Sequence, residues 1–401
     1  MFIKNKLNND VIHMKRFDEK EIEAITQLIK NEDYLSGFTT SFRGGEQIQK
    51  FEKEFARFIG VKHAISVNSG TSALFIAFRA SMEYGLARNN KKFRIPDIHL
   101  PACTFTADPS SAMMAGGKII FEDIDEKTFC MISPKSKSTI SVPTHLLGNA
   151  NGSDDFGDPD ILIEDCCQAL GTEIDGKKVG SFGDLSIFSF QETKHITTLG
   201  EGGMICSNND ELIDIVAGIR NHAEFYLEKK YLGGNFRMTE IQAAFGLVQL
   251  KKIKKILKSF RENAKFVIKN LPSGISPPYI PSNVNHSFLI IGCLYDEKII
   301  GVNREIFLER LTKNRSSLLE GDKKSDIKGI NMKSGKLISH GYSSPLYEIP
   351  IYKKFKPKNE CTNAKKFTAT SIWMDIHRFR KKDEIKEEIE ILNKTINEFA
   401  K

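Results

Sequence analysis

At 401 residues the chain is long for a single hydrophobic core, and two domains are expected. Hydrophobic residues make up 40% and charged residues 27%, which is the balance of an ordinary globular protein. No apolar run approaches the roughly 18 residues that span a bilayer, so no membrane span or membrane partner is predicted. The amino terminus, MFIKNKLNND, is polar and is no signal peptide, so we expect a cytoplasmic protein.

The formal net charge of +7 suits an anionic ligand, although a lysine-rich surface explains the same excess without one. Seven cysteines form no C-x-x-C pair, which excludes the usual zinc and disulfide frameworks. Their odd number fits a reducing cytoplasm. We therefore predict no metal site. No helix-turn-helix is evident, and no nucleic-acid partner is predicted.

Two amphipathic helices are predicted near the amino terminus. Asp18 and Glu21 resemble a capping box at the start of the first helix. Its apolar face comprises Ile22, Ile25, Leu28 and Ile29. Residues 33–45 are polar and contain glycine, which indicates a loop. The second helix covers Glu46–Ile59 and ends at Gly60 as a C′ glycine.

A strand over 64–67 is followed by the turn Asn-Ser-Gly-Thr-Ser at 68–72 and an apolar helix through Phe78. The free amide groups and the positive end of such a helix favour an anion such as phosphate. A glycine at this place lets the backbone approach the anion closely. The candidate phosphate-binding residues are Gly70, Thr71 and Ser72. An ordinary turn between a strand and a helix is the alternative explanation.

Six further short apolar runs are predicted to be strands. They lie at 98–100, 118–121, 139–142, 161–163, 185–190 and 204–206. In an open α/β sheet, ligands bind at the carboxyl ends of the strands. Asp165 follows one of these runs, Ser189 ends another, and Lys194 comes shortly after it. A carboxylate that holds a proton on a pyridine nitrogen, together with a lysine that forms a Schiff base, suits pyridoxal phosphate chemistry.

A long helix is predicted to start at Thr239, which forms a second capping box with Gln242. Its buried side comprises Ile241, Phe245, Val248, Ile253, Ile256, Leu257 and Phe260. Residues 221–234 before it are polar, which indicates a loop.

The glycine motifs end at about residue 260. Residues 314–337 are polar and loop-like, and 383–399 is a closing amphipathic helix. We therefore place a large domain at 1–260, which includes the amino-terminal helices, and a smaller domain at 261–401.

Four motifs in a fixed order carry a resemblance to one family. They are E-D-x-x-Q-A at 164–169, G-S-F-G-D at 180–184, F-S-F-x-x-x-K at 188–194 and G-E-G-G at 200–203. With them the chain resembles the DegT/DnrJ/EryC1/StrS sugar aminotransferases, which depend on pyridoxal 5′-phosphate (PLP) and have the fold-type I architecture. The resemblance implies a large PLP-binding α/β domain, with a mostly parallel central sheet between helices, and a smaller carboxyl-terminal α/β domain.

The resemblance implies two catalytic residues. Lys194 is expected to bind the cofactor as a Schiff base and, after an amino donor displaces it, to move a proton during the reaction. Asp165 is expected to pair with the pyridinium nitrogen and keep it protonated, so that the ring acts as an electron sink.

The resemblance also implies the remaining cofactor-binding residues. Phe105 is expected to stack on one face of the ring, and Gln168 to hydrogen-bond the ring hydroxyl. The phosphate is expected to lie among Gly70, Thr71, Ser72 and Ser189. In the family, the asparagine at the position of Asn235 reaches across a homodimer interface to the phosphate of the other subunit, which would make two shared active sites.

Several positions depart from the family pattern. Cys167 replaces the usual alanine, but a thiol is only slightly larger and behaves as a small hydrophobe. Leu199 looks like a one-residue insertion before the G-E-G-G turn, and residues 83–95 and 314–337 look like longer insertions. His145 either contacts the substrate or packs within a loop.

The resemblance implies transfer of an amino group from glutamate or glutamine to a keto sugar, usually nucleotide-linked, in amino-sugar or glycan biosynthesis. A sugar dehydratase of the same family is an alternative. Those enzymes replace the lysine with histidine, so Lys194 favours transamination, although His195 follows it directly. The identity of the sugar, the nucleotide and the aminated carbon stay open.

A PLP-binding regulator is a further alternative. Such regulators carry a DNA-binding module before the cofactor domain, and only about forty residues precede the first family motif here. A dinucleotide dehydrogenase is disfavoured because no G-x-G-x-x-G follows a predicted strand.

Overall fold

The computed structural model describes most of the chain. The described residues are 15–31, 34–36, 41–89, 95–135, 137–152, 156–223, 232–316, 338–339, 341–376 and 382–399. The middle of the predicted loop at 221–234, most of the predicted insertion at 314–337, and residues 90–94 lie outside them.

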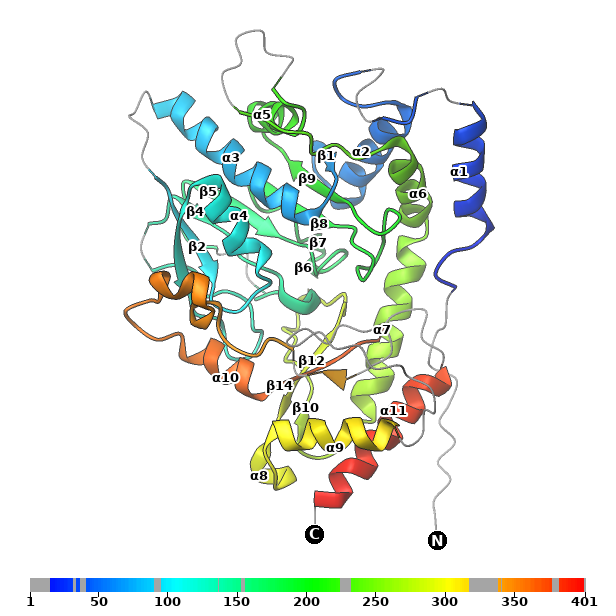
Figure 1. Cartoon of the computed structure of the whole chain (residues 1–401), viewed down its shortest axis with the longest axis vertical. Coiled ribbons are helices and arrows are strands. Elements are labelled where there is room, and N and C mark those ends of the chain that lie inside the picture. Colours follow the sequence, from blue (N-terminus) through cyan, green and yellow to red (C-terminus); the bar gives the residue numbers. More distant parts are fainter. Residues whose placement is uncertain are drawn as a thin grey trace.

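A seven-stranded sheet organises the upper part of the molecule (Figure 1). Its strand order is β1 (His63–Val67), β9 (Gly203–Ser207), β8 (Leu185–Ser189), β5 (Ile161–Asp165), β4 (Ile140–Ser141), β2 (Asp97–Pro101) and β3 (Lys118–Glu122). The strands from β8 to β3 are parallel to one another, whereas β9 runs antiparallel to both of its neighbours. The mostly parallel sheet predicted from the sequence is therefore confirmed.

Helices cover both faces of this sheet (Figure 1). One face packs against α3 (Gly70–Asn89), which lies beside α4 (Ala107–Ala115) and α5 (Asp210–Arg220). The other face packs against α2 (Glu46–Ile59) and α6 (Glu240–Lys251), with α1 (Glu19–Asn31) against α6. Strand β8 shows the sequence basis of these layers. Its neighbours Ile187 and Phe188 belong to opposite cores because strand side chains alternate between the two faces.

Helix α2 has the predicted bounds. Gly60 ends it in a left-handed conformation with φ of 93°, and its N–H donates to the carbonyl oxygen of Ala56 at 2.9 Å. Helix α3 extends to Asn89, so the first part of the predicted insertion at 83–95 is helical.

The apolar face predicted for the first helix is wrong at two positions. In α1, Leu28 is buried, but Ile22 and Ile29 are 57% and 55% exposed. The other buried side chain is Glu21, whose carboxylate accepts a hydrogen bond from the Lys252 ammonium group at 2.7 Å. An ion pair, rather than an apolar stripe, therefore orients this helix against the large domain.

The single helix predicted after Thr239 is two helices. The capping box of Thr239 with Gln242 is present at the start of α6. A break at Lys252, where φ is −90° and ψ is −3°, separates α6 from α7 (Ile253–Lys269). The apolar period continues across the break, so the sequence pattern does not reveal it. The predicted domain boundary between 260 and 261 lies within α7.

A second sheet lies in the lower part of the molecule (Figure 1). It is antiparallel, with the order β10 (Ile275–Ser276), β12 (Ile291–Tyr295), β14 (Ser371–Met374) and β13 (Ile338–Ser339). Near it lie α8 (Glu297–Ile300), α9 (Arg304–Ser316) and α11 (Lys382–Phe399). A small third sheet joins β11 (Val284–Asn285), β6 (Glu173–Ile174) and β7 (Lys177–Lys178).

The segment from 341 to 370 returns to the large sheet. It contains the short 3-10 helices η2 (Leu346–Glu348) and η3 (Pro350–Phe355) and the helix α10 (Thr362–Thr370). The N–H of Leu346 donates to the carbonyl oxygen of Ala102 at 2.8 Å, and the N–H of Ala364 donates to Asp123 at 2.9 Å. Part of the carboxyl-terminal segment therefore packs beside the seven-stranded sheet.

None of the helices in the described ranges is both long enough and apolar enough to cross a membrane.

Candidate active site

Strand β5 ends in two carboxylates that lie on opposite faces of the sheet, since successive strand residues alternate. Glu164 is fully buried, and Asp165 is 5% exposed. Their surroundings differ in the number of hydrogen-bond donors that each carboxylate receives.

Both oxygens of Glu164 are saturated with donors. Oε1 accepts from the backbone N–H groups of Phe182 and Gly183 at 2.7 and 2.8 Å. Oε2 accepts from the N–H of Gly180 at 2.8 Å and lies 3.0 Å from Nε2 of His145. The acidic residue of the E-D motif thus fixes the backbone of the G-S-F-G-D motif, which explains why the two motifs occur together.

His145 packs within a loop, which decides between its two predicted roles. The ring is 2% exposed, contacts Glu164 and meets the edge of Phe156 with ring centroids 6.2 Å apart. The Cys166 thiol also lies within 4.8 Å of these polar atoms. Burial, and then the charge of Glu164, raise the pKa of Cys166 well above its usual value, so it stays a neutral thiol. With the Glu164 oxygens engaged, these three residues form a structural cluster.

Asp165 faces the side of the sheet that α3 and α4 cover. Its Oδ1 accepts a hydrogen bond from the backbone N–H of Cys167 at 2.8 Å. The N–H of His145 donates to its carbonyl oxygen at 3.0 Å, which fixes the backbone at the strand end. The predicted position of this carboxylate, at the carboxyl end of a buried strand, agrees with the structure.

Asp108 is a second carboxyl group at this position, and the sequence analysis did not identify it. It lies in the first turn of α4 and is fully buried. One oxygen, Oδ2, accepts from the hydroxyls of Thr104 at 2.5 Å and Thr144 at 3.4 Å. Burial, and then the charge of Asp165, raise the pKa of Asp108 well above its usual range.

Gln168 is buried beside this pair of carboxyl groups. Its Oε1 accepts from the N–H of Leu147 at 2.9 Å, and its Nε2 donates to the phenol oxygen of Tyr342 at 3.3 Å. Tyr342 is partly buried, and desolvation raises its pKa well above the usual value, so the phenol stays neutral. The sequence analysis missed Tyr342 because no motif precedes it.

The turn before α3 has the geometry of a phosphate site. The Ser69 hydroxyl accepts from the N–H of Ser72 at 3.0 Å and so caps this 20-residue helix. A Cβ on Gly70 would lie 2.9 Å from Cβ of Ser189 and 3.2 Å from the sulfur of Cys167. Only glycine therefore allows these groups to approach the helix amino terminus, where the first amide groups have no partners within the helix.

Lys194 lies in the loop after β8 and is partly buried. Its positive charge acts on the thiol of Cys167, which also adjoins Asp165. The loop contains Leu199 with φ of 62°, a conformation that costs a side chain of this type about 1 kcal/mol. The inserted residue predicted there is thus accommodated in a left-handed turn. His195, which follows Lys194, is buried, and its Nε2 lies 3.1 Å from the carbonyl oxygen of Ser287.

Two predicted residues lie at the surface. Phe105, between β2 and α4, is 48% exposed, so a face of its ring is free for a flat ligand. Asn235 is exposed as well, and its side chain accepts a long hydrogen bond, 3.4 Å, from the N–H of Arg237. The adjacent Phe236 carbonyl oxygen accepts from the N–H of Asn68 at 2.9 Å, which ties this segment to the phosphate turn.

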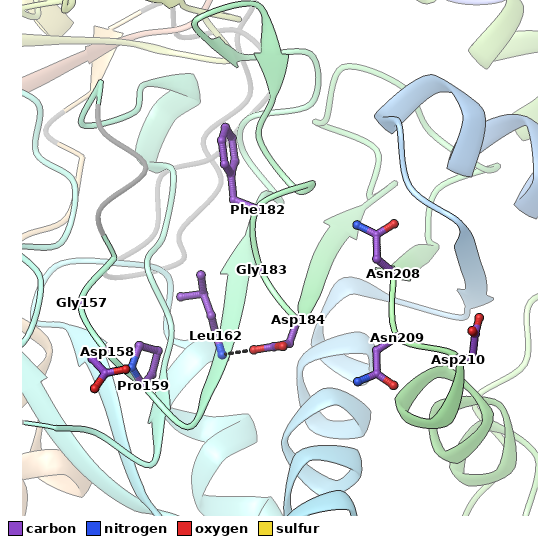
Figure 2. A pocket seen from close by; sticks show the side chains of 10 residues that line it. All are labelled: Gly157, Asp158, Pro159, Leu162, Phe182, Gly183, Asp184, Asn208, Asn209 and Asp210. Carbon is purple, nitrogen blue, oxygen red and sulfur yellow. Dashed lines mark hydrogen bonds between the residues drawn. The ribbon is translucent and has the colours of Figure 1, made fainter.

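A separate hollow lies at the opposite edge of the sheet (Figure 2). This open cavity of about 620 Å³ is lined by residues near the amino ends of β5 and β8, among them Leu162 and Asp184. The dashed line in Figure 2 is the hydrogen bond from the N–H of Leu162 to Asp184, at 2.8 Å. Asp165 lies at the other end of β5, so this hollow is not part of the candidate site.

The residues at the carboxyl edge of the sheet fit PLP. The Gly70 turn accommodates a phosphate, Phe105 offers a ring face, Asp165 offers a carboxylate and Lys194 an amine. This fold and this arrangement of groups define the class of fold-type I aminotransferases.

The model of the DegT/DnrJ/EryC1/StrS aminotransferase family matches residues 16–318, and the chain belongs to that family. It is 33% identical to the GDP-perosamine synthase of Vibrio cholerae, over 70% of this chain and 77% of that protein. It is 30% identical to the GDP-4-keto-6-deoxy-D-mannose 3-dehydratase of Yersinia pseudotuberculosis, over 66% of this chain and 71% of that protein. The crystal structure of an aminotransferase from Psychrobacter cryohalolentis has the same fold, with a TM-score of 0.79 and 22% identity, covering 98% of this chain and all of that chain.

Proposed function

We propose that this chain is a PLP-dependent aminotransferase that moves an amino group from glutamate or glutamine to a nucleotide-linked keto sugar. The observation that carries the proposal is the position of Lys194, whose charge reaches Cys167 directly beside Asp165. An amine and a carboxylate on either side of Cys167 suit the two ends of one pyridine ring. When bound, PLP supplies an electron sink for the bond that breaks at the amino-bearing carbon.

Lys194 is proposed to bind the cofactor covalently and then to act as a general base. Its amine accepts the proton from the substrate carbon and gives a proton back at a later step of the amino transfer. The short loop around it supports this role, since the N–H of Glu192 donates to the carbonyl oxygen of Gly200 at 2.8 Å and closes the loop at its base.

Asp165 is proposed to hold a proton at the ring nitrogen. It receives one backbone hydrogen bond at 2.8 Å and keeps acceptor capacity for a further donor. Gln168 is proposed to donate through Nε2 to the ring hydroxyl, because its Oε1 already accepts from Leu147. Phe105 is proposed to stack on the ring, and the phosphate to be bound by Gly70, Thr71, Ser72 and Ser189.

A homodimer with shared sites is proposed as the working form. The exposed side chain of Asn235 supports this proposal, because it lies beside the phosphate turn of its own chain yet points to solvent. In a two-fold dimer the same patch of each chain meets its copy, so each asparagine can complete its partner's site.

The nucleotide-linked substrate is supported by the names of the relatives, which act on GDP-linked sugars. A cytoplasmic location is proposed as well. It is supported by the seven free cysteines, six of which are buried. Residues 1–260 and 261–401 remain the proposed domains, joined by α7.

A sugar dehydratase of the same family is the second candidate, because one relative carries that activity. The orientation of His195 disfavours it. Its ring packs against Phe260, with centroids 4.7 Å apart, on the side away from the candidate site. A non-catalytic regulator is also disfavoured, since nothing about the positions of Lys194 and Asp165 requires such a role.

The proposal is tested by incubating the purified protein with PLP, glutamate and a panel of GDP-linked and UDP-linked keto sugars. An amino product is recognised by its mass, and a dehydrated product indicates the dehydratase. Borohydride reduction followed by peptide mapping should find the cofactor on Lys194. Lys194→Ala should lose the visible cofactor band and all amination, whereas Lys298→Ala, at an exposed position on α8, should keep both. Attachment to another lysine contradicts the assignment.

The shared site is tested by mixing two inactive variants. Lys194→Ala and Asn235→Ala should each be impaired alone, and should recover activity after subunit exchange, because one site of the mixed dimer has both native residues. A monomer in light scattering, or proven exchange without recovery, excludes the shared site.

A further inference from the structure

Asp108 is a buried acid whose hydrogen bonds are incomplete. Its side chain is fully buried, and Oδ2 accepts from Thr104 and Thr144. Its other oxygen, Oδ1, is also buried and receives no donor from any residue that the structure describes. A buried carboxylate oxygen without a donor costs several kcal/mol, so this oxygen must be accounted for by a proton or by a partner.

The acid beside it is Asp165, whose side chain and charge both act to raise the pKa of Asp108. The Thr144 hydroxyl approaches Asp108, and the Thr144 backbone pairs with Asp165, so one residue joins the two acids. Cys167, Tyr342 and the Lys194 amine, whose charge acts on Cys167, are further titratable groups around this pair. Burial raises the pKa of both the Cys167 thiol and the Tyr342 phenol, so both stay neutral near neutral pH.

Two neighbouring carboxylates in a buried site do not both ionise, because like charges repel strongly there. One proton is therefore held by the pair. Asp165 accepts a backbone N–H, which favours its anion, whereas Asp108 is the more deeply buried of the two. Burial, and then the charge of Asp165, raise the pKa of Asp108, so the proton belongs on Asp108.

We propose that Asp108 is a neutral acid that donates a hydrogen bond from its Oδ1 to the Asp165 carboxylate, and that it is a positioning residue for that carboxylate. Asp165 then receives the Cys167 N–H on one side and the Asp108 O–H on another. The two donors fix its orientation at the end of β5, and the site keeps one negative charge instead of two. The single negative charge of Asp165 matches the single positive charge of a protonated ring nitrogen. This charge match rests on the proposed PLP site, whereas the protonation of Asp108 does not.

The proton is tested on the protein without cofactor. Infrared spectroscopy at neutral pH should show the carbonyl stretch of a protonated carboxylic acid. The band should disappear in Asp108→Asn and persist in Asp158→Asn, a matched change at an exposed aspartate. Absence of the band, or its persistence in Asp108→Asn, overturns the proposal whether or not the protein binds PLP.

Stability against pH gives a second readout. The unfolded chain releases the Asp108 proton near the ordinary value of 3.8, whereas the folded chain keeps it to higher pH. Because the folded pKa is raised, the contribution of Asp108 to wild-type stability falls as the pH rises from about 4 toward that pKa, by up to about tenfold in the folding equilibrium constant per pH unit. Asp108→Asn lacks this loss. The ratio of its folding equilibrium constant to that of the wild type should therefore increase as the pH rises. A ratio that is constant or falls with pH contradicts a proton on Asp108.

The positioning role is tested by cofactor affinity, measured from quenching of the fluorescence of Trp373, the single tryptophan, by added PLP. Asp108→Asn keeps an N–H donor toward Asp165 and should bind PLP within about threefold of the wild type. Asp108→Leu removes the donor and excludes a substituting water, so the dissociation constant should rise at least about tenfold. Equal affinities for the leucine variant and the wild type overturn the positioning role. If Asp108→Leu does not fold, a large loss in Asp108→Asn overturns it instead.

Discussion

Glu164 and Asp165 are neighbours in the sequence, yet they have opposite environments. Glu164 receives four donors, three from the backbone of the 180–183 turn and one contact from His145. Asp165 receives one backbone donor and faces a second acid. A structural carboxylate is therefore recognisable by complete hydrogen bonding, and a functional one by the acceptor capacity that it keeps. Four predictions test this contrast.

Glu164→Gln should have the largest effect on stability. The amide places an NH₂ group against backbone N–H donors and removes the partner of His145. We expect the free energy of unfolding to fall by about 3–5 kcal/mol, because several hydrogen bonds from buried donors to one carboxylate are lost. Urea denaturation measures this loss, with the exposed Glu126→Gln as the control. A loss below about 1 kcal/mol would show that the turn is fixed by other contacts.

Asp165→Asn should have the opposite effect to Glu164→Gln: the fold stays intact and the activity is lost. The amide cannot keep a ring nitrogen protonated, so turnover should fall by about 10²-fold or more. The free energy of unfolding without cofactor should stay within about 1 kcal/mol of the wild type, because the asparagine oxygen can still accept the hydrogen bond from the N–H of Cys167. Near-normal turnover by Asp165→Asn contradicts its assigned role.

Gly70→Ala should weaken phosphate binding on the Asp165 side of the sheet. The added Cβ meets Ser189 and Cys167 at 2.9 and 3.2 Å, so the turn must open. The dissociation constant of PLP should rise about tenfold, while that of pyridoxal, which has no phosphate, changes little. Gly85→Ala in the same helix is the control, because nothing lies within 4 Å of its Cβ. That control should gain up to about 1 kcal/mol in stability.

Cys167→Ala should have the smallest effect. Its contribution to Asp165 is a backbone N–H, which alanine keeps. PLP affinity should stay within about threefold, and stability within about 1.5 kcal/mol. Burial, and then Asp165, raise the pKa of the thiol, so iodoacetamide should leave Cys167 unmodified at neutral pH in the folded protein. Rapid alkylation would contradict this environment.

The sequence predicted those parts of the fold that depend on local patterns of apolar residues and glycine. The strands that end in Asp165 and Ser189 are short apolar runs, and α2 has a regular apolar period and a terminal glycine. The exposure of Ile22 and Ile29 was not predictable in this way, because a period shows which residues share a helix face but not whether another element covers it.

The site residues named from the sequence are those that motifs mark, and the residues that the sequence did not reveal are brought to the site by tertiary contacts. Asp165 occupies a motif position at the end of β5, and Lys194 occupies one in the loop after β8. Asp108 looks like an ordinary acidic residue in the first turn of a helix, where a charge is favourable, until the fold buries it against Asp165. Nothing in the sequence near Tyr342 indicates that it meets Gln168.

That contact joins residues 174 positions apart, and the Tyr352 hydroxyl meets Thr106 at a separation of 246. During synthesis the amino-terminal part of a chain leaves the ribosome first, and contacts of high sequence separation form last because their loops are entropically costly to close. The sheet with its motifs is therefore made well before the segment that completes the surroundings of Gln168. Tight binding of PLP should therefore develop later than the sheet. A nascent chain stalled before residue 341 would bind PLP with lower affinity than the released protein.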